Sequence, residues 1–241
     1  MSRTAAVVPA AGRGERLGPG APKALRSIGG VPMLVHAVRA LAAARSVDLV
    51  VIAAPEDGVA EVTALLADHG IVESGPGRAA TLVVSGGDTR QDSVARALVA
   101  LPYDVDVVLV HDAARPLVPT SLVEAVVQTV RGGADAVVPG LAVADTIKSI
   151  DRSEHVTGTL DRASLRAIQT PQGFRRHVLT DAHAAADPGA PATDDAGLVE
   201  ALGGTVVVIP GHEEAFKVTR PFDLVVAEAV LARRRAAGVL S

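Results

Sequence analysis

One stretch near the start of the chain decides the fold: Val7-Val8-Pro9-Ala10-Ala11-Gly12-Arg13-Gly14-Glu15-Arg16-Leu17, followed shortly by Pro22-Lys23. The apolar run over residues 5–8 predicts a buried strand that ends in a glycine-rich turn. Backbone N–H groups in such a turn bind anions, and Arg16 and Lys23 add two cations. The stretch therefore predicts a loop that binds a triphosphate.

Two better-known phosphate loops do not match this stretch. A P-loop needs Gly-Lys followed by Ser or Thr, and a dinucleotide-binding fingerprint needs a third glycine where Leu17 stands. The missing glycine also disfavours an oxidoreductase built on such a fingerprint. Gly12 and Gly14 alone are compatible with a simple tight turn, and Arg16 with a solvated surface charge. The combination with Lys23 is what favours phosphate binding.

The composition is that of one globular domain. The chain has 241 residues, of which 49% are hydrophobic and 21% charged, and it contains no Trp, one Tyr and three Phe. We expect a single domain over residues 1–241 with an aliphatic core. The net charge is −4, and neither a large basic block nor an aromatic set favours nucleic-acid binding. The basic run Arg233-Arg234-Arg235 is expected to form a solvated helix end.

The chain contains no cysteine, which excludes disulfides, thiolate zinc sites and cysteine nucleophiles. The N-terminus lacks the features of a secretory signal, and no apolar run reaches membrane-spanning length. We therefore expect a soluble, cytoplasmic protein without a membrane partner.

Val-rich runs alternate with stretches of helical periodicity. Strands are predicted over residues 48–54, 81–85, 105–110, 136–138 and 205–209, and helices over residues 33–44, 59–69, 92–101, 121–131, 196–202 and 222–236. This alternation predicts an α/β fold: a Rossmann-like, mostly parallel sheet with helices on both faces. Ligands bind at the carboxyl ends of strands in such sheets, so functional residues should follow the Val-rich runs.

A glycine pair with polar neighbours follows the run over residues 81–85. The backbone at Gly87 and Asp88, with the Ser93 hydroxyl, could form a pocket for the edge of a pyrimidine base. The alternative is structural: the glycines only let the chain leave the strand, and Asp92 or Ser93 only caps the next helix.

An acid and a base follow the run over residues 105–110, in His111-Asp112-Ala113-Ala114-Arg115. Asp112 could approach a magnesium-bound phosphate or a substrate hydroxyl, because Mg²⁺ takes one or two carboxylates and completes its shell with water and phosphate oxygens. The alternative is an Asp112–Arg115 ion pair that organises the turn. His111 is expected to pack or to donate a hydrogen bond, and the histidines lack the spacing of a transition-metal site.

The segment over residues 141–164 breaks the alternation. Residues 146–150 and 155–160 could pair as a hairpin, with Asp151-Arg152-Ser153 in the turn. A hairpin extruded from the sheet exposes apolar side chains, and a second copy of the chain is the simplest cover. The sequence thus predicts a homodimer with this arm at the interface.

Eight segments resemble, in order, those of the sugar-phosphate nucleotidylyltransferases known as 2-C-methyl-D-erythritol 4-phosphate cytidylyltransferases, which serve the non-mevalonate isoprenoid pathway. They span about residues 5 to 228: Pro-Ala-Ala-Gly-Arg-Gly-Glu-Arg-Leu, Pro22-Lys23, Gly-Gly-Asp-Thr-Arg-Gln-Asp-Ser-Val, Val-His-Asp-Ala-Ala-Arg-Pro, Asp145-Thr146-Ile147-Lys148, Ile168-Gln169-Thr170-Pro171-Gln172, Thr193-Asp194-Asp195 and Lys217-Val218-Thr219. The chain departs from the family pattern at Ala24-Leu25 and at Ala215-Phe216.

The resemblance implies a reaction and a set of roles. A phosphate oxygen of the polyol phosphate would attack the α-phosphorus of CTP, with Mg²⁺ as cofactor and pyrophosphate as leaving group. CTP would be held by Pro9, Ala10, Ala11, Gly12, Gly14, Gly87, Asp88 and Ser93. The implied catalytic residues are Arg16, Lys23, Lys217 and Arg162. Acceptor binding would fall to Asp112, Arg115, Thr146, Arg162 and Thr193, with Thr146 and Arg162 reaching the neighbouring subunit's site.

Two other functions stay open from the residues alone. A cytidylyltransferase for ribitol 5-phosphate or another polyol phosphate would share nearly all of the nucleotide-side motifs. A non-catalytic nucleotide-binding module could share the fold, but it would be expected to lose a phosphate-binding cation, and Arg16, Lys23, Arg162 and Lys217 are all present.

Overall fold

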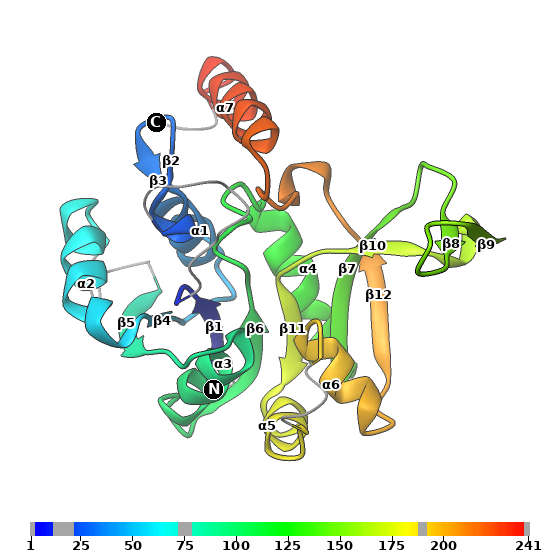
Figure 1. Ribbon diagram of the computed structural model, residues 1–241. Coiled ribbons are helices and arrows are strands. Elements are labelled where there is room, and N and C mark those ends of the chain that lie inside the picture. Colours follow the sequence, from blue (N-terminus) through cyan, green and yellow to red (C-terminus); the bar gives the residue numbers. More distant parts are fainter. Residues whose placement is uncertain (1–2, 12–21, 72–78, 188–191, 239–241) are drawn as a thin grey trace.

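An eight-stranded sheet runs through the molecule (Figure 1). The computed structural model describes residues 3–11, 22–71, 79–187 and 192–238. The strands of this sheet are β1 (Arg3–Pro9), β4 (Leu49–Ala54), β5 (Ala80–Ser85), β6 (Val105–Val110), β7 (Ala136–Ala142), β10 (Arg166–Ile168), β11 (Gln172–Arg175) and β12 (Val206–Pro210).

The sheet contains two groups of parallel strands. β1 pairs in parallel with β4 and with β6, β4 pairs in parallel with β5, and β12 pairs in parallel with β7. β11 lies between β6 and β7 and is antiparallel to both, and β10 is antiparallel to the far end of β7. The predicted mostly parallel sheet is confirmed, with two antiparallel strands, β10 and β11, in it.

Helices cover both faces of the sheet, as predicted. The apolar side chains of α1 (Met33–Ala42), α2 (Val59–Asp68) and α4 (Thr120–Arg131) pack on one face. Those of α3 (Arg90–Val99), α5 (Arg176–Ala184) and α6 (Asp195–Ala201) pack on the other. Successive strand residues point to opposite faces, so both layers bury apolar surface against the same strands.

The predicted helices begin and end within two residues of the observed ones, but the start of α3 corrects the prediction for its cap. Thr89, not Asp92 or Ser93, is the N-cap: its hydroxyl accepts a hydrogen bond from the Asp92 N–H, and the Asp92 carboxylate accepts one from the Thr89 N–H. This capping box satisfies two free N–H groups of the first turn and starts the helix at Arg90.

Several elements are not predicted by the sequence patterns. β10, β11 and α5 follow one another without a Val-rich run, and β7 continues beyond the predicted residue 138 to Ala142. The short elements are the strands β2 (Ser27–Ile28) and β3 (Val31–Pro32) and the 3₁₀ helices η2 (Lys23–Leu25), η3 (Glu56–Gly58), η4 (Arg162–Ser164) and η5 (Glu213–Ala215).

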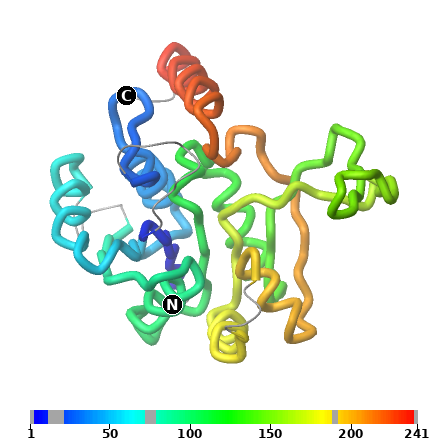
Figure 2. The backbone as a smooth tube through the Cα atoms, viewed as in Figure 1, coloured from blue at the N-terminus to red at the C-terminus, as the bar shows by residue number. Residues whose placement is uncertain are grey.

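A hairpin projects from the end of the sheet beyond β7 and β10 (Figures 1 and 2). β8 (Lys148–Ile150) pairs antiparallel with β9 (Val156–Thr159), inside the two segments predicted to pair. Asp151 organises the turn, because its carboxylate accepts hydrogen bonds from the N–H groups of Ser153 and His155. We call residues 141–164 the arm; its place at a dimer interface stays a prediction.

The last helix, α7 (Pro221–Ala236), is not simply a solvated end. Arg233 and Arg234 both form ion pairs with Glu214, and the Arg234 guanidinium also donates to the Leu117 carbonyl at 2.7 Å. The Arg234 side chain is only 17% exposed, so the expectation of a solvated basic run is wrong for this residue. These contacts fasten α7 to the segment that carries Lys217.

Within the described ranges, no helix is both long enough and apolar enough to cross a bilayer.

Candidate active site

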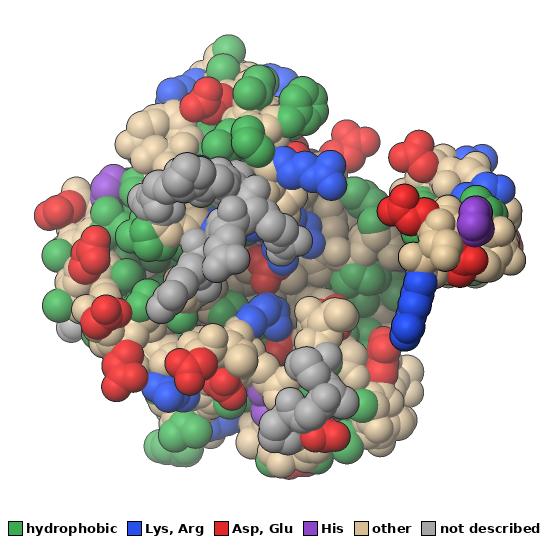
Figure 3. Space-filling model, viewed as in Figure 1, with side chains coloured by type: hydrophobic (Ala, Val, Ile, Leu, Met, Phe, Trp, Pro, Cys, Tyr) green, Lys and Arg blue, Asp and Glu red, His purple; other side chains and the backbone are tan. Residues whose placement is uncertain are grey.

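A pocket opens at the carboxyl ends of β1, β5 and β6, the edge of the sheet where the sequence predicts a ligand. Figure 3 shows basic and acidic side chains gathered in the hollowed centre of this face. Of the residues predicted for the site, the pocket is lined by Pro9, Ala10, Ala11, Lys23, Gly87, Asp88, Ser93, Asp112 and Lys217. Residues more than 200 positions apart in the sequence thus share one cavity.

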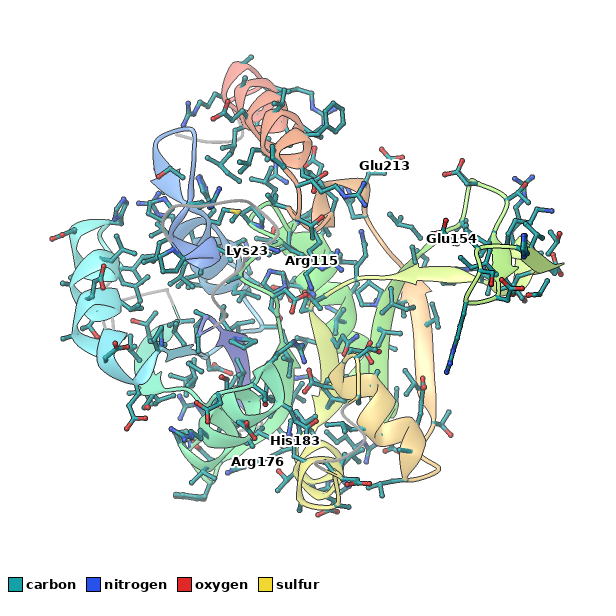
Figure 4. All side chains as sticks on the ribbon, in the orientation of Figure 1. Lys23, Arg115, Glu154, Arg176, His183 and Glu213 are labelled. Atoms are coloured by element: carbon teal, nitrogen blue, oxygen red, sulfur yellow. The ribbon has the colours of Figure 1, made fainter. Side chains whose placement is uncertain are left out.

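The other predicted residues are of two kinds, those that the structure does not describe and those that it places outside the pocket lining. Gly12, Gly14 and Arg16 fall outside the described residues. Thr193 is exposed just before α6, and Thr146 and Arg162 are exposed on the arm, where Arg162 donates to the Ala144 carbonyl. Figure 4 marks the arm by Glu154, well away from Lys23 and Arg115 at the centre. The arm of this chain therefore does not reach the chain's own pocket.

The Gly86–Gly87 turn brings backbone to the pocket wall. A Cβ on Gly87 would lie 2.3 Å from the Asp92 Cβ, and one on Gly86 would lie 3.0 Å from the Ala54 carbonyl oxygen, so the turn has no room for side chains. The Ser93 hydroxyl accepts a hydrogen bond from the Gly87 N–H at 3.1 Å and lies 2.9 Å from the Thr89 carbonyl. Ser93 thus shapes the turn; its contact with a base stays a prediction.

Asp112 is the acidic centre of the pocket. Its Oδ2 lies 2.8 Å from Lys217 Nζ, its Oδ1 lies 3.3 Å from Arg90 Nε, and Arg115 Nε is 3.9 Å away. Burial would raise the pKa of this carboxyl, but Arg90, Lys217 and Arg115 together hold it well below its ordinary value. Asp112 is therefore a stable carboxylate surrounded by cations.

This environment does not suit Asp112 as a magnesium ligand. Both of its oxygens face cationic nitrogens, whereas Mg²⁺ needs oxygen lone pairs directed at the metal. The described part of the chain also contains no group of three His, Cys, Asp or Glu side chains that could hold a metal. The assignment of a metal to Asp112 is therefore not retained; oxygens of a bound triphosphate are the better ligands.

His111 supports the loop from behind and does not face the pocket. Its side chain is fully buried, with Nε2 3.1 Å from the Arg115 carbonyl and Nδ1 3.1 Å from Thr170 Oγ1, which accepts the Asp112 N–H. Burial lowers the pKa of His111 to about 4, so the ring is neutral near pH 7. The interpretation of His111 as a packed hydrogen-bond donor fits this arrangement.

Arg115 acts mainly on other parts of the chain. The residue is 8% exposed, and its guanidinium donates to the carbonyls of Ala215 at 2.7 Å and Ile168 at 3.2 Å. The Val218 N–H donates to the Ala114 carbonyl at 2.8 Å. Arg115 and its neighbour thus fix the segment on both sides of Lys217; a contact of Arg115 with substrate stays a prediction.

Gln169 holds the same segment from the other side. This residue is 3% exposed, and its amide both donates to the His212 carbonyl and accepts from the His212 N–H, each at 3.0 Å. An amide paired in this way with a peptide unit fixes backbone in both directions. The Lys217 ammonium therefore enters the pocket from a rigid support.

Arg90 is the functional residue that the sequence patterns miss. It lines the pocket with Lys23 and Lys217 and contacts Asp112 directly. It is the first residue of α3 and stands in the segment that follows the Gly86–Gly87 turn, but nothing in that segment assigns it a role; its contact with Asp112 identifies it. Three cations and backbone N–H groups around one cavity are suited to bind a polyphosphate and to stabilise charge that develops on it.

Comparisons with known proteins identify the family of the chain. The IspD family model, described as 2-C-methyl-D-erythritol 4-phosphate cytidylyltransferase, matches residues 4–233. A protein of that name from Streptomyces avermitilis is 60% identical over 240 residues, covering 97% of this chain and 94% of its own length. One from Frankia casuarinae is 55% identical over 231 residues, covering 96% and 82%.

Solved structures carry the same fold. The crystal structure of 2-C-methyl-D-erythritol 4-phosphate cytidylyltransferase from Thermus thermophilus has a TM-score of 0.74 at 37% identity, covering 95% of this chain and 98% of its own. A 4-diphosphocytidyl-2C-methyl-D-erythritol synthase from Anaerococcus prevotii gives 0.80 at 25% identity, covering 96% and 99%. The chain is a member of the IspD family, the 2-C-methyl-D-erythritol 4-phosphate cytidylyltransferases.

Proposed function

We propose that this protein joins CTP and 2-C-methyl-D-erythritol 4-phosphate to give 4-diphosphocytidyl-2-C-methyl-D-erythritol and pyrophosphate. Family membership and the names of its relatives support the reaction. The observation that carries it here is the convergence of Lys23, Gly87, Asp112 and Lys217, from four separate segments, on one pocket. The protein is thus a nucleotidyltransferase.

The chemistry needs no protein nucleophile. An oxygen of the acceptor phosphate attacks the α-phosphorus of CTP, the new P–O bond forms, and the bond from that phosphorus to the bridging oxygen breaks as pyrophosphate leaves. The attacking phosphate is already an anion, so no general base has to remove a proton. Catalysis then consists of positioning and of stabilising charge on the phosphate oxygens.

The cations of the pocket have distinct positions for this task. Lys23, at the start of η2, would neutralise the triphosphate, and Lys217, which lines the same pocket, would bridge the α-phosphate and the incoming phosphate. Mg²⁺, bound through phosphate oxygens and water, would supply further positive charge to the leaving pyrophosphate. Backbone at Gly87 and Asp88 would contact the cytosine edge.

The acceptor would lie on the Asp112 side of the pocket. The Asp112 carboxylate is a strong acceptor for the hydroxyl groups of a polyol. Arg115 would keep Asp112 in place, and Thr193, two residues before Asp195 in the sequence, would contact an acceptor hydroxyl. Thr146 and Arg162 would come from the arm of a second copy and hold the acceptor phosphate.

A homodimer would cover apolar side chains that the arm and the nearby strands leave exposed. Ile150 is 58% exposed, Val156 61%, Leu160 46% and Val208 48%. Exposed apolar side chains of this kind are typical of surfaces that a partner covers. Neither a nucleic acid nor a membrane is part of the proposal, and we place the reaction in the cytoplasm.

Mixed dimers test whether a site is shared. Lys23→Ala and Arg162→Gln variants should each be nearly inactive, and mixing them under exchange should restore about one quarter of wild-type activity, because half of the dimers are hybrid and one site in each is intact. No recovery in samples shown to contain hybrid dimers would place the arm outside the partner's site.

The reaction itself is tested by the release of pyrophosphate from CTP, which should depend on 2-C-methyl-D-erythritol 4-phosphate. Release that does not depend on this acceptor, or no release at all, would refute the function.

A further inference from the structure

Arg90 lies between two carboxylates of very different exposure. Its Nε is 3.3 Å from Asp112 Oδ1 at the pocket wall, and its terminal nitrogen is 2.7 Å from Asp195 Oδ2. The side chain of Arg90 is 32% exposed, that of Asp112 12% and that of Asp195 1%. One end of the guanidinium therefore faces the pocket side, and the other is anchored in the interior.

The buried anchor is itself held by a third residue. Asp195 Oδ1 lies 2.9 Å from His183 Nε2, and the His183 side chain is 4% exposed. Among the described residues, His183 Nδ1 has no hydrogen-bond partner. The Nε2–H group donates in this contact, because the carboxylate oxygen of Asp195 can only accept. His183, Asp195, Arg90 and Asp112 form one chain of contacts from α5 to the pocket.

Asp195 is not needed to cap its helix. The N-cap of α6 is Asp194, whose carboxylate accepts the Gly197 N–H at 2.9 Å and the Gln172 amide at 2.6 Å. The neighbouring carboxylate at Asp195 points instead to Arg90 and His183. Burying a carboxylate costs several kcal/mol unless it is paired, so Asp195 holds Arg90 tightly. The two adjacent acids thus have separable roles.

The arrangement of charges around Asp112 also depends on Asp195, which holds Arg90 in place. Arg90, Arg115 and Lys217 provide three positive charges against the two carboxylates Asp112 and Asp195. Without Asp195, Arg90 could turn its guanidinium toward the triphosphate, since phosphate is the stronger partner. Asp112 would then keep Lys217 as its main partner and withhold it from the reacting phosphates.

We propose that Arg90 is a positioning residue for the acceptor side of the site, fixed from behind by Asp195 and His183. Arg90 keeps the Asp112 carboxylate directed at the acceptor hydroxyls. It also neutralises part of the negative charge of that carboxylate, so that Lys217 can leave Asp112 and bind the phosphates. The inference rests on the proposed function, because it assigns Asp112 to the acceptor.

Isosteric variants of the full-length protein test the proposal. Asp195→Asn keeps the shape of the side chain and removes the charge that anchors Arg90, and Asp194→Asn is the matched control, since asparagine also caps helices. Arg90→Gln removes the guanidinium that contacts both Asp112 and Asp195, and Arg90→Lys keeps the positive charge but not the planar guanidinium. Initial rates are measured with CTP and 2-C-methyl-D-erythritol 4-phosphate varied separately, together with Tm for each variant.

We expect the variants to change the kinetic constants for the acceptor much more than those for CTP. Asp195→Asn should raise KM for the acceptor about tenfold and change KM for CTP by less than about threefold, because only the acceptor wall loses its geometry. Arg90→Gln should lower kcat/KM for the acceptor by about 100-fold, with partial recovery in Arg90→Lys. The double variant Arg90→Gln/Asp195→Asn should be no worse than Arg90→Gln, since both changes break one chain.

Other outcomes would overturn it. A lower Tm with unchanged KM for both substrates would make the cluster purely structural, and an equal rise in both KM values would place Arg90 on the nucleotide. Additive losses in the double variant would separate the two residues. If wild-type protein transfers cytidylyl only to a different polyol phosphate, the proposed function fails, and the same comparison of kinetic constants, made with that acceptor, still decides the role of Arg90.

Discussion

Lys217 Nζ lies 2.8 Å from Asp112 Oδ2, and this ion pair joins the two sides of the pocket. The Lys217 side chain is 38% exposed and Asp112 12%, so the lysine is the partner that can move to an incoming anion. In this structure Asp112 thus holds the cation that we propose for the phosphate chemistry. Arg90 and Arg115 remain beside the carboxylate when the lysine leaves it.

Lys217→Met should therefore lower kcat by about 100-fold or more, the cost of removing a preorganised group that stabilises developing charge. The fold should persist, because Asp112 keeps two arginine partners and the backbone around residue 217 is held by Arg115 and Val218. Steady-state kinetics with an unfolding curve checks both points. Activity within a few-fold of wild type would remove Lys217 from the phosphate chemistry.

Lys23→Ala should lower kcat by about 100-fold or more for the same reason, since Lys23 lines the same pocket as Lys217. The circular dichroism spectrum should match that of wild type. Lys23→Arg serves as the charge-preserving comparison and should lose less. A near-normal rate for Lys23→Ala would show that the triphosphate is neutralised elsewhere.

Gly87→Ala should distort the turn that we propose contacts the base of CTP. The added Cβ would fall 2.3 Å from the Asp92 Cβ, so the turn must shift, at a cost of about 1–3 kcal/mol in the free energy of unfolding. We also expect KM for CTP to rise. Gly158→Ala is the control: its Cβ would meet no atom within 4 Å, and stability should change by less than about 0.5 kcal/mol. Equal effects of the two substitutions would contradict the tight turn.

The buried ring of His111 should make the protein less stable in mild acid. The pKa of His111 is about 4 in the folded protein, against an ordinary value of 6.5, so between these limits the unfolded chain binds a proton that the native state does not. Stability then rises with pH through this window and falls by at most about 3 kcal/mol from pH 7 to pH 4. The depressed pKa of Asp112 affects stability only at lower pH, below its ordinary value of 3.8.

Urea unfolding between pH 4 and pH 7 measures this slope, with His111→Asn as the comparison. The variant should be less stable at pH 7 but should show a shallower pH dependence. Burial also lowers the pKa of His36, so part of the slope should remain. An unchanged slope in His111→Asn would show that His111 does not titrate as described.

Periodicity alone predicts most of the fold because each Val-rich run and each amphipathic helix is a local pattern. β11 has no such pattern: Gln172-Gly173-Phe174-Arg175 is a strand because β6 and β7 leave a gap between them that it fills. A Cβ on Gly173 would lie 2.4 Å from a Val126 methyl, which shows how closely α4 covers that strand. Such a fit is a property of the assembled layers.

The residues of the site also differ in whether a local sequence pattern predicts them. Lys23, Gly87 and Asp112 could be predicted because each follows a strand or a glycine turn at the ligand-binding edge, whereas Lys217 could be predicted only from the resemblance to the family. Arg90 could not, since its role depends on Asp195, more than 100 positions away in the sequence. An ion pair between residues far apart in the sequence produces no local sequence pattern that could predict it.

Pyrophosphate release is the most direct test of the central claim, that this pocket transfers a cytidylyl group from CTP to the phosphate of 2-C-methyl-D-erythritol 4-phosphate. The protein is assayed with Mg²⁺, each of the four ribonucleoside triphosphates, and either that acceptor or ribitol 5-phosphate. The account predicts rapid release only with CTP and 2-C-methyl-D-erythritol 4-phosphate, with one equivalent of the diphosphocytidyl product. Equal or faster turnover with ribitol 5-phosphate, or no turnover of CTP with either acceptor, would contradict it.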